Sequence, residues 1–150
     1  ARNSARGRRY RYVLLQSPVR PSVEAGLVGW TFLPLDGDAM QRAADHLLGE
    51  HDFSSFRAAG CQAASPVKTM RAVTVRRHGA YWLLDFDASG CLVAVGAGRQ
   101  PPGWMAEVLA ARDRDAAAPT FAPDGLVFLG PYYDASIGLP AGSPAMDWWD

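Results

Sequence analysis

Alternating apolar and polar residues mark the strands of this chain. Residues 10–15 and 67–77 show the two-residue period of a half-buried strand. Residues 28–33, 80–86 and 126–129 are short apolar segments that also predict strands. His78-Gly79 stands between two of these segments and is typical of a tight turn, so residues 67–86 predict a β-hairpin.

A 3.6-residue period marks the clearest helix. Asp36 or Asp38 can cap a helix that runs to about Leu48, and Gly49 is a natural stop. Its apolar positions fall on one face and are Met40, Ala43, Ala44, Leu47 and Leu48. Pro101-Pro102 predicts the start of a second helix, because proline is tolerated in a first turn. Residues 90–95 have room for about two further helical turns.

The order of these elements predicts an α+β fold, with an antiparallel sheet of about four strands packed on two or three helices. At 150 residues the chain fits a single domain, residues 1–150. We expect residues 1–9 to form a solvated basic arm, because arginines crowd there without apolar periodicity. Residues 131–150 are rich in glycine and proline and are expected to form a tail.

Composition narrows the function classes. Hydrophobic residues make up 49% of the chain and charged residues 20%, which is typical of a soluble globular protein. The formal net charge is zero, which argues against strong non-specific binding to nucleic acid. The longest apolar runs are too short for a membrane span, so no membrane partner is expected.

The sequence contains no clear motif for binding a cofactor or a metal ion. His46 and His51 are five residues apart, which does not match a helical metal pair, so no metal site is expected. Gly96-Ala97-Gly98 lacks the third glycine of a dinucleotide loop, because residue 101 is proline. Cys61 and Cys91 are expected to be reduced, with a single disulfide as the alternative. We expect no cofactor.

The most specific motif is Gly49-Glu50-His51-Asp52-Phe53-Ser54-Ser55-Phe56-Arg57, which continues to Cys61-Gln62 and Ser65-Pro66. It resembles the block G-E-H-D-F-[ST]-S-F-R, C-Q-x-x-[ST]-P in the C-terminal half of the tRNA pseudouridine synthase A (TruA-type) family. Further likeness lies in the Tyr10-Arg11-Tyr12 strand, in the helix from Trp104 and in Gly125-Leu126. The resemblance implies the α+β half-domain of that family and a cytoplasmic protein.

Two departures from the family pattern weigh against catalysis. The family's nucleophile is an aspartate in the motif R-T-D-A-G-V-H, and this sequence has no such motif. After Ala88 the family continues into N-A-F-x-H-H-M-V-R-N-I-V-G, whereas this chain passes directly to Ser89-Gly90-Cys91. The arginine that sits beside the catalytic aspartate falls in the missing stretch. We therefore expect an internal deletion, no catalytic residues and no enzymatic activity.

The resemblance also implies which residues contact RNA. Tyr10 falls at the family's tyrosine in the Y-x-Y strand, and Leu126 falls at its active-site leucine. Around Tyr10 lie Arg8, Arg9 and Arg11, which could contact phosphates while the tyrosine stacks on a base. The alternative is that the arginines are solvated and that Tyr10 and Leu126 are simply sheet residues.

Large apolar residues in unusual places suggest another function. They are Leu27, Trp30, Phe32, Leu33, Trp148 and Trp149. Exposed aromatic residues often anchor protein interfaces, although these could equally be buried against the sheet. The leading hypothesis is therefore an engineered, non-catalytic scaffold that binds a protein partner, or associates with itself, through this patch. The alternative is the residual tRNA-binding half of a pseudouridine synthase.

Overall fold

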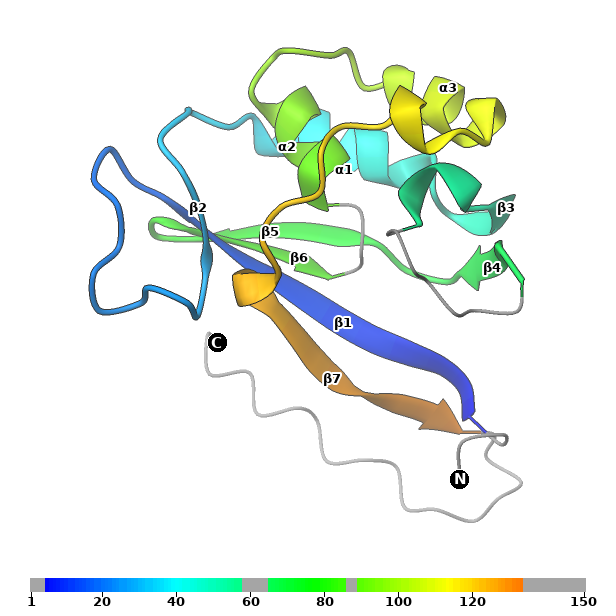
Figure 1. Ribbon diagram of the computed structural model, residues 1–150, viewed down its shortest axis with the longest axis horizontal. Helices are drawn as coiled ribbons and strands as arrows, with labels where there is room; N and C mark the ends of the chain where they lie inside the picture. Colours follow the sequence, from blue (N-terminus) through cyan, green and yellow to red (C-terminus); the bar gives the residue numbers. More distant parts are fainter. Residues whose placement is uncertain (1–4, 58–64, 86–88, 134–150) are drawn as a thin grey trace.

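The computed structural model describes residues 5–57, 65–85 and 89–133 (Figure 1). These residues form an α+β fold in which three helices lie on one face of a five-stranded sheet, and a small second sheet lies beside them. The strands are β1 (Ala5–Gln16), β2 (Gly29–Thr31), β3 (Gly49–Asp52), β4 (Val67–Met70), β5 (Thr74–His78), β6 (Tyr81–Asp85) and β7 (Leu126–Tyr133). The predicted fold class is confirmed.

Strand β1 is the centre of the main sheet. Its inner residues pair with β6 on one edge, with Tyr12 opposite Leu84, and β6 pairs in turn with β5. On its other edge β1 pairs first with β7 and then with β2. The β1–β2 pair is parallel, whereas the prediction was an antiparallel sheet. The segment 17–28 is long enough to carry the chain back for a parallel pairing.

The helices are α1 (Gly37–Asp45), α2 (Ser89–Gly96) and α3 (Trp104–Ala111). Asp36 caps α1 as predicted, since its side chain accepts a hydrogen bond of 2.9 Å from the Ala39 amide. Gly49 follows with a φ of 95°, a left-handed value that suits glycine and turns the chain into β3. Leu48, predicted on the apolar face, is 41% exposed because the helix ends before it.

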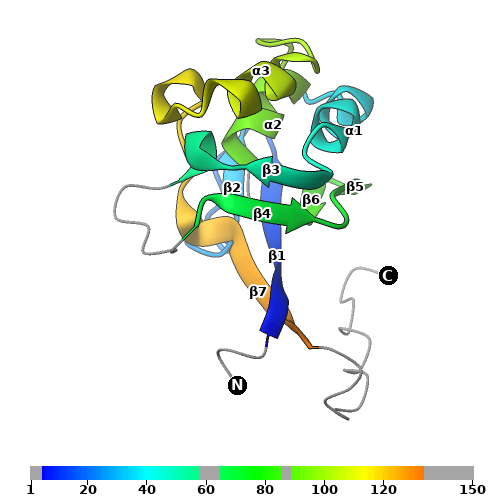
Figure 2. The same ribbon diagram turned by 90° about the vertical axis from the view of Figure 1, so that its right-hand side faces the viewer.

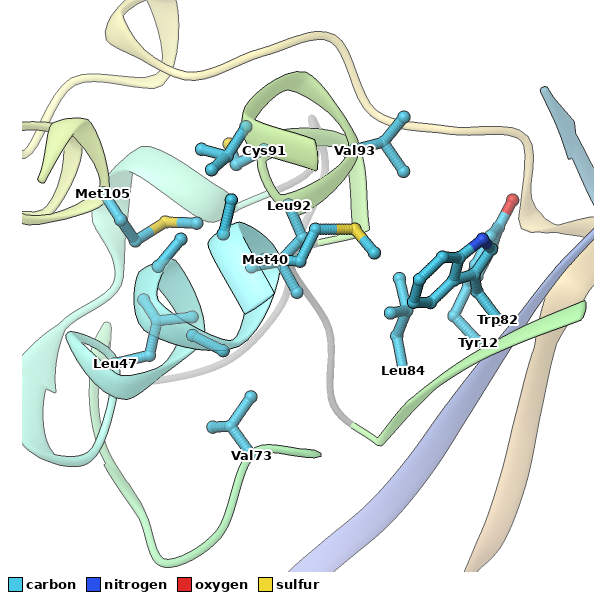
Figure 3. Close-up of a cluster of buried hydrophobic side chains, with 14 of the residues drawn as sticks. Tyr12, Met40, Leu47, Val73, Trp82, Leu84, Cys91, Leu92, Val93 and Met105 are labelled. Carbon is cyan, nitrogen blue, oxygen red and sulfur yellow. The ribbon is translucent and has the colours of Figure 1, made fainter. Parts of the chain in front are cut away.

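One apolar core joins the helices to the sheet (Figure 3). Tyr12, Trp82 and Leu84 rise from β1 and β6 toward Met40 of α1 and Leu92 of α2. Full burial of one such side chain contributes about 1.5–3 kcal/mol, so this layer holds the fold together. Helix α2 is apolar on all sides because it is buried in the middle of this core.

Three boundaries differ from the sequence prediction. Residues 5–9 were expected to be a solvated arm, but they belong to β1 and pair with β7. The same pairing extends β7 to Tyr133, into the segment predicted as tail. Residues 67–77 were predicted as one strand, but they form β4 and β5, which lie in different sheets. Each difference depends on a partner strand distant in the sequence.

Candidate functional site

The outer halves of β1 and β7 form a two-stranded ribbon that extends beyond the helices (Figures 1 and 2). Tyr10 lies opposite Phe128, and Tyr12 lies opposite Leu126. Alternate residues of a strand share a face, so Tyr10, Leu126 and Phe128 lie on the same face as the core residue Tyr12. We call the ribbon face made by Tyr10, Leu126 and Phe128 the aromatic shelf.

The aromatic shelf is accessible to solvent. Leu126 is 39% exposed and Phe128 is 54% exposed, while Tyr10 is half-buried. The rings of Tyr10 and Phe128 pack at 5.3 Å between centroids with an interplanar angle of 48°. This tilted arrangement is one that aromatic pairs favour. The shelf therefore offers a flat apolar surface outside the core.

The arginines beside the shelf differ in their surroundings. Arg8 and Arg9 are both exposed, and Arg8 shares the face of Tyr10 by strand alternation. Arg11 is only 9% exposed and belongs to the opposite face. Its Nε donates to Asp85 Oδ1 at 2.5 Å and its Nη2 donates to Asp85 Oδ2 at 3.0 Å. Arg11 was predicted as an RNA contact, but this ion pair gives its guanidinium a structural role.

Small residues and one hydroxyl fix the start of β7. Tyr12 donates a hydrogen bond of 2.8 Å to the Ala122 carbonyl. A Cβ on Gly125 would lie 2.3 Å from the Val13 carbonyl oxygen, and a Cβ on Gly29 would lie 2.3 Å from the Tyr12 hydroxyl oxygen. The two glycines thus allow β7 and β2 to approach β1 closely, which fixes the position of Leu126 in the shelf.

Burial also affects the chemistry of Tyr12. Its side chain is 2% exposed, and this burial, with a smaller contribution from Asp124, raises the pKa of Tyr12 to about 12. The hydroxyl therefore remains protonated and continues to donate to Ala122 at any physiological pH. Tyr12 is a structural anchor at the end of the shelf that adjoins the core.

The most specific motif of the sequence has a structural role. Within it, Ser55 is fully buried, donates to the Val108 carbonyl at 2.6 Å and accepts from the Asp113 amide at 2.9 Å. Asp52 accepts from the Ser54 hydroxyl and amide, and these hydrogen bonds lower the pKa of Asp52. The motif thus joins β3 to the end of α3, and the ribbon belongs to other segments.

The residues of the predicted protein-partner patch differ in exposure, and the rings of Trp30 and Phe32 lie 5.9 Å apart between centroids. Leu27 and Phe32 are 66% and 62% exposed, but Leu33 is half-buried. The Trp30 indole donates to the carbonyls of Ser17 and Val19 at 3.0 and 3.1 Å, so its polar atom anchors its own loop. The Arg20 guanidinium covers its ring at 4.9 Å from the centroid. Trp148 and Trp149 lie outside the described residues.

The described residues contain neither a candidate metal site nor a helix that could span a membrane. Within residues 5–57, 65–85 and 89–133, the side chains of His, Cys, Asp and Glu form no group of three that could hold a metal ion. The helices in these same ranges fall short of the length and hydrophobicity that crossing a bilayer requires. Cys91 is a free, buried thiol whose pKa is raised by burial, and Cys61 lies outside the described residues.

Comparison with known proteins places the chain in a family. A family model for tRNA pseudouridine synthase matches residues 43–134. The tRNA pseudouridine synthase A of Methylibium petroleiphilum is 62% identical over 159 residues, which cover 99% of this chain and 61% of that protein. Those of Polaromonas naphthalenivorans and Delftia acidovorans are 58% and 56% identical, and the matches cover 62% and 64% of their lengths. The chain belongs to the tRNA pseudouridine synthase family.

The lengths of these matches bear on the predicted deletion. The chain spans about 61–64% of the length of these relatives. The alignment with the Methylibium protein extends over 159 residues, whereas the chain has 150, so at least nine aligned positions have no counterpart here. Gapped positions of this kind are what an internal deletion produces.

Two predictions from the sequence are wrong. The chain is not supported as an engineered protein-binding scaffold, because its relatives are bacterial proteins named as tRNA pseudouridine synthases. The prediction of no enzymatic activity is contradicted by the same names, since the family is one of enzymes. That prediction rested on the missing aspartate motif and the missing arginine, whereas the match covers only 61% of the Methylibium protein and leaves the rest of its sequence uncompared.

Sequence reasoning missed Phe128, Gly125 and the Arg11–Asp85 pair. Phe128 stands two residues after Leu126, so the alternation of β7 could have placed it on the same face. The close approach at Gly125 and the pairing of Arg11 with Asp85 had no such local signal, because each joins residues far apart in the chain.

Proposed function

We propose that this chain supplies the RNA-holding part of a tRNA pseudouridine synthase, an enzyme that isomerises uridine in tRNA. In this proposal the aromatic shelf receives the unpaired uridine, and Arg8 contacts a neighbouring phosphate. The observation that carries the proposal is the placement of Arg8, Tyr10 and Leu126 along one solvent-accessible face of the ribbon.

The chemistry of single-stranded RNA fits this face. Proteins read unpaired bases by stacking them on aromatic side chains and hold the backbone with arginine or lysine. Tyr10 offers the ring and Leu126 an apolar neighbour, as the resemblance to the family implies for both residues. Arg8 adds a cation two residues along the same strand, about 7 Å away at the usual strand rise.

Catalysis requires a carboxylate against the uridine, which the family supplies from an aspartate motif that these 150 residues do not contain. Asp85 does not serve this purpose, because it lies across from Arg11 and accepts two hydrogen bonds from it. The part proposed for this chain is therefore to bind and orient the nucleoside, and uridine isomerisation is proposed for the whole protein.

A binding experiment with unmodified tRNA tests the proposal. Fluorescence anisotropy at several salt concentrations should show an affinity that falls steeply as salt rises, because phosphate contacts release counterions. Arg8→Gln should weaken binding and reduce the salt slope by about one. Tyr10→Ala should weaken binding, while Tyr10→Phe, which keeps the ring, should restore most of it.

Arg99→Gln is the matched control, because it removes the same charge from an exposed site in the loop that follows α2. Figure 1 shows this loop beyond the helices, at the other end of the molecule from the ribbon. If Arg8→Gln and Arg99→Gln lower the affinity for tRNA equally, the loss comes from the change in net charge alone. That outcome would refute a site on the ribbon. Undetectable tRNA binding by the unaltered chain would refute the proposal as a whole.

A further inference from the structure

Phe128 is an exposed aromatic residue in a paired strand. It stands within β7, directly across from Tyr10, and yet more than half of its surface is accessible. Val127, the residue before it, belongs by alternation to the opposite face. Its only ring contact among the described residues is with Tyr10, so one side of the pair remains open to a ligand.

Distance argues that Phe128 serves a different nucleotide from Leu126. Side chains two residues apart on a strand are about 7 Å apart along it. Consecutive stacked bases are about 3.4 Å apart, which is less than this spacing, so the two side chains can contact different bases of one strand. The shelf is therefore long enough for the uridine and for the base next to it.

The backbone changes course just beyond Phe128. The register of β1 and β7 shifts between Arg9 and Tyr10, so that Leu129 is an extra residue, and Gly130 has a φ of 137°. Such bulges redirect side chains and are frequent beside functional sites. The bulge ends the regular alternation of β7 after Phe128. Phe128 is therefore the last residue of β7 that alternation places on the shelf.

We propose that Phe128 is a second base-stacking residue, which contacts an unpaired nucleobase adjacent to the uridine held by Tyr10 and Leu126. This inference rests on the proposed function, because it concerns the same RNA on the same face. Stacking on a ring is tolerant of base identity, so Phe128 takes a purine or a pyrimidine. It extends the site from one nucleotide to two.

The test uses an RNA hairpin with an unpaired loop uridine and 2-aminopurine as the next base. The full chain should quench 2-aminopurine fluorescence, because stacking on an aromatic ring does so. Phe128→Leu should lower the affinity for this hairpin about fivefold or more, the low end of the contribution of one stacked base, and should remove most of the quenching. Phe128→Trp should keep both.

Val127→Ala is the matched control, because Val127 is 43% exposed on the other face of the same strand and should leave affinity and quenching unchanged. Circular dichroism of each variant confirms that the sheet is intact. If Phe128→Leu binds and quenches as the unaltered chain does, while Arg8→Gln and Tyr10→Ala weaken binding, Phe128 is no base contact and the proposed function stands. Failure of the unaltered chain to bind the hairpin would overturn both.

Discussion

The guanidinium of Arg11 and the carboxylate of Asp85 form a two-point ion pair across β1 and β6. Both side chains are largely withdrawn from water, with 11% and 27% of their surfaces exposed. Thr74 also donates to Asp85 at 3.2 Å, and Arg76 lies 3.6 Å from it. The pair joins β1 to β6 at the end of their pairing, where β1 leaves the core and becomes part of the ribbon.

Breaking this pair is expected to destabilise the fold. Asp85→Asn leaves the Arg11 charge without its partner, and such changes cost about 3–5 kcal/mol at buried sites. Because Asp85 is partly exposed, we expect the lower end of this range. Urea unfolding followed by tryptophan fluorescence measures it. The double variant Arg11→Met with Asp85→Leu should recover much of the loss, and a double variant as unstable as Asp85→Asn would contradict this account.

Ser55→Ala is expected to loosen the join between β3 and α3. The change leaves the Val108 carbonyl and the Asp113 amide without their side-chain partner, which costs about 1–3 kcal/mol for a buried group. Thermal unfolding measures the loss. Ser65→Ala is the control, because Ser65 is exposed and makes one hydrogen bond, to the Val67 amide. Equal melting temperatures for the two variants would show that Ser55 contributes nothing special.

Gly125→Ala is expected to displace the start of β7. The new methyl group would meet backbone atoms, at 2.3 Å from the Val13 oxygen and 2.7 Å from the Gly29 nitrogen, and neither can rotate away. Overpacking of this kind costs about 1–3 kcal/mol. Gly103→Ala is the contrast, because a Cβ there meets nothing within 4 Å and φ is −63°. Gly103→Ala should raise stability by about 0.4–1 kcal/mol.

Alkaline pH should destabilise the fold through Tyr12. Its pKa of about 12 in the folded chain exceeds the ordinary value of about 10. The neutral hydroxyl therefore stabilises the fold fully below pH 10, and this contribution is lost as pH rises toward 12. The loss amounts to about 2–3 kcal/mol at 1.36 kcal/mol per unit. Urea unfolding between pH 9 and 11.5 measures the early part of it.

Tyr12→Phe provides the control for the alkaline titration. It should be less stable at neutral pH by about 1 kcal/mol, because the bond to Ala122 is lost, but its stability should depend less on pH. Tyr81, whose pKa is also raised, by its hydrogen bond to Glu24, remains in both proteins and contributes equally. Parallel pH curves for the two proteins would exclude Tyr12 as the cause.

The sequence predicted those parts of the fold that depend on nearby residues. The Asp36 cap, the apolar face of α1 and the hairpin of β5 and β6 each arise from side chains within a few turns or one tight loop. The extent of β1 was underestimated because residues 5–9 carry arginines, and only pairing with β7 makes them a strand. Long-range pairing has no periodic signature in the sequence.

The arrangement of the candidate site residues could be anticipated only in part. Tyr10 and Leu126 came from the resemblance to the family, and the structure places them on the same face of the adjacent strands β1 and β7. Arg11 was grouped with Arg8 and Arg9 because all three are arginines in one run. Alternation sends Arg11 to the opposite face, where Asp85 lies, and residue type alone does not reveal such a carboxylate.

Strand β1 has two environments along its length, and amide hydrogen exchange should distinguish them. Leu14 and its neighbours are bordered by strands on both edges and lie under the core, so their amides should exchange only on global unfolding. Arg8 and Arg9 lie where the ribbon extends past the helices, so their amides should exchange through local fraying at much lower free energy. On this expectation, one continuous strand combines an inner half that opens only when the whole fold does with an outer half that opens locally while the core stays folded.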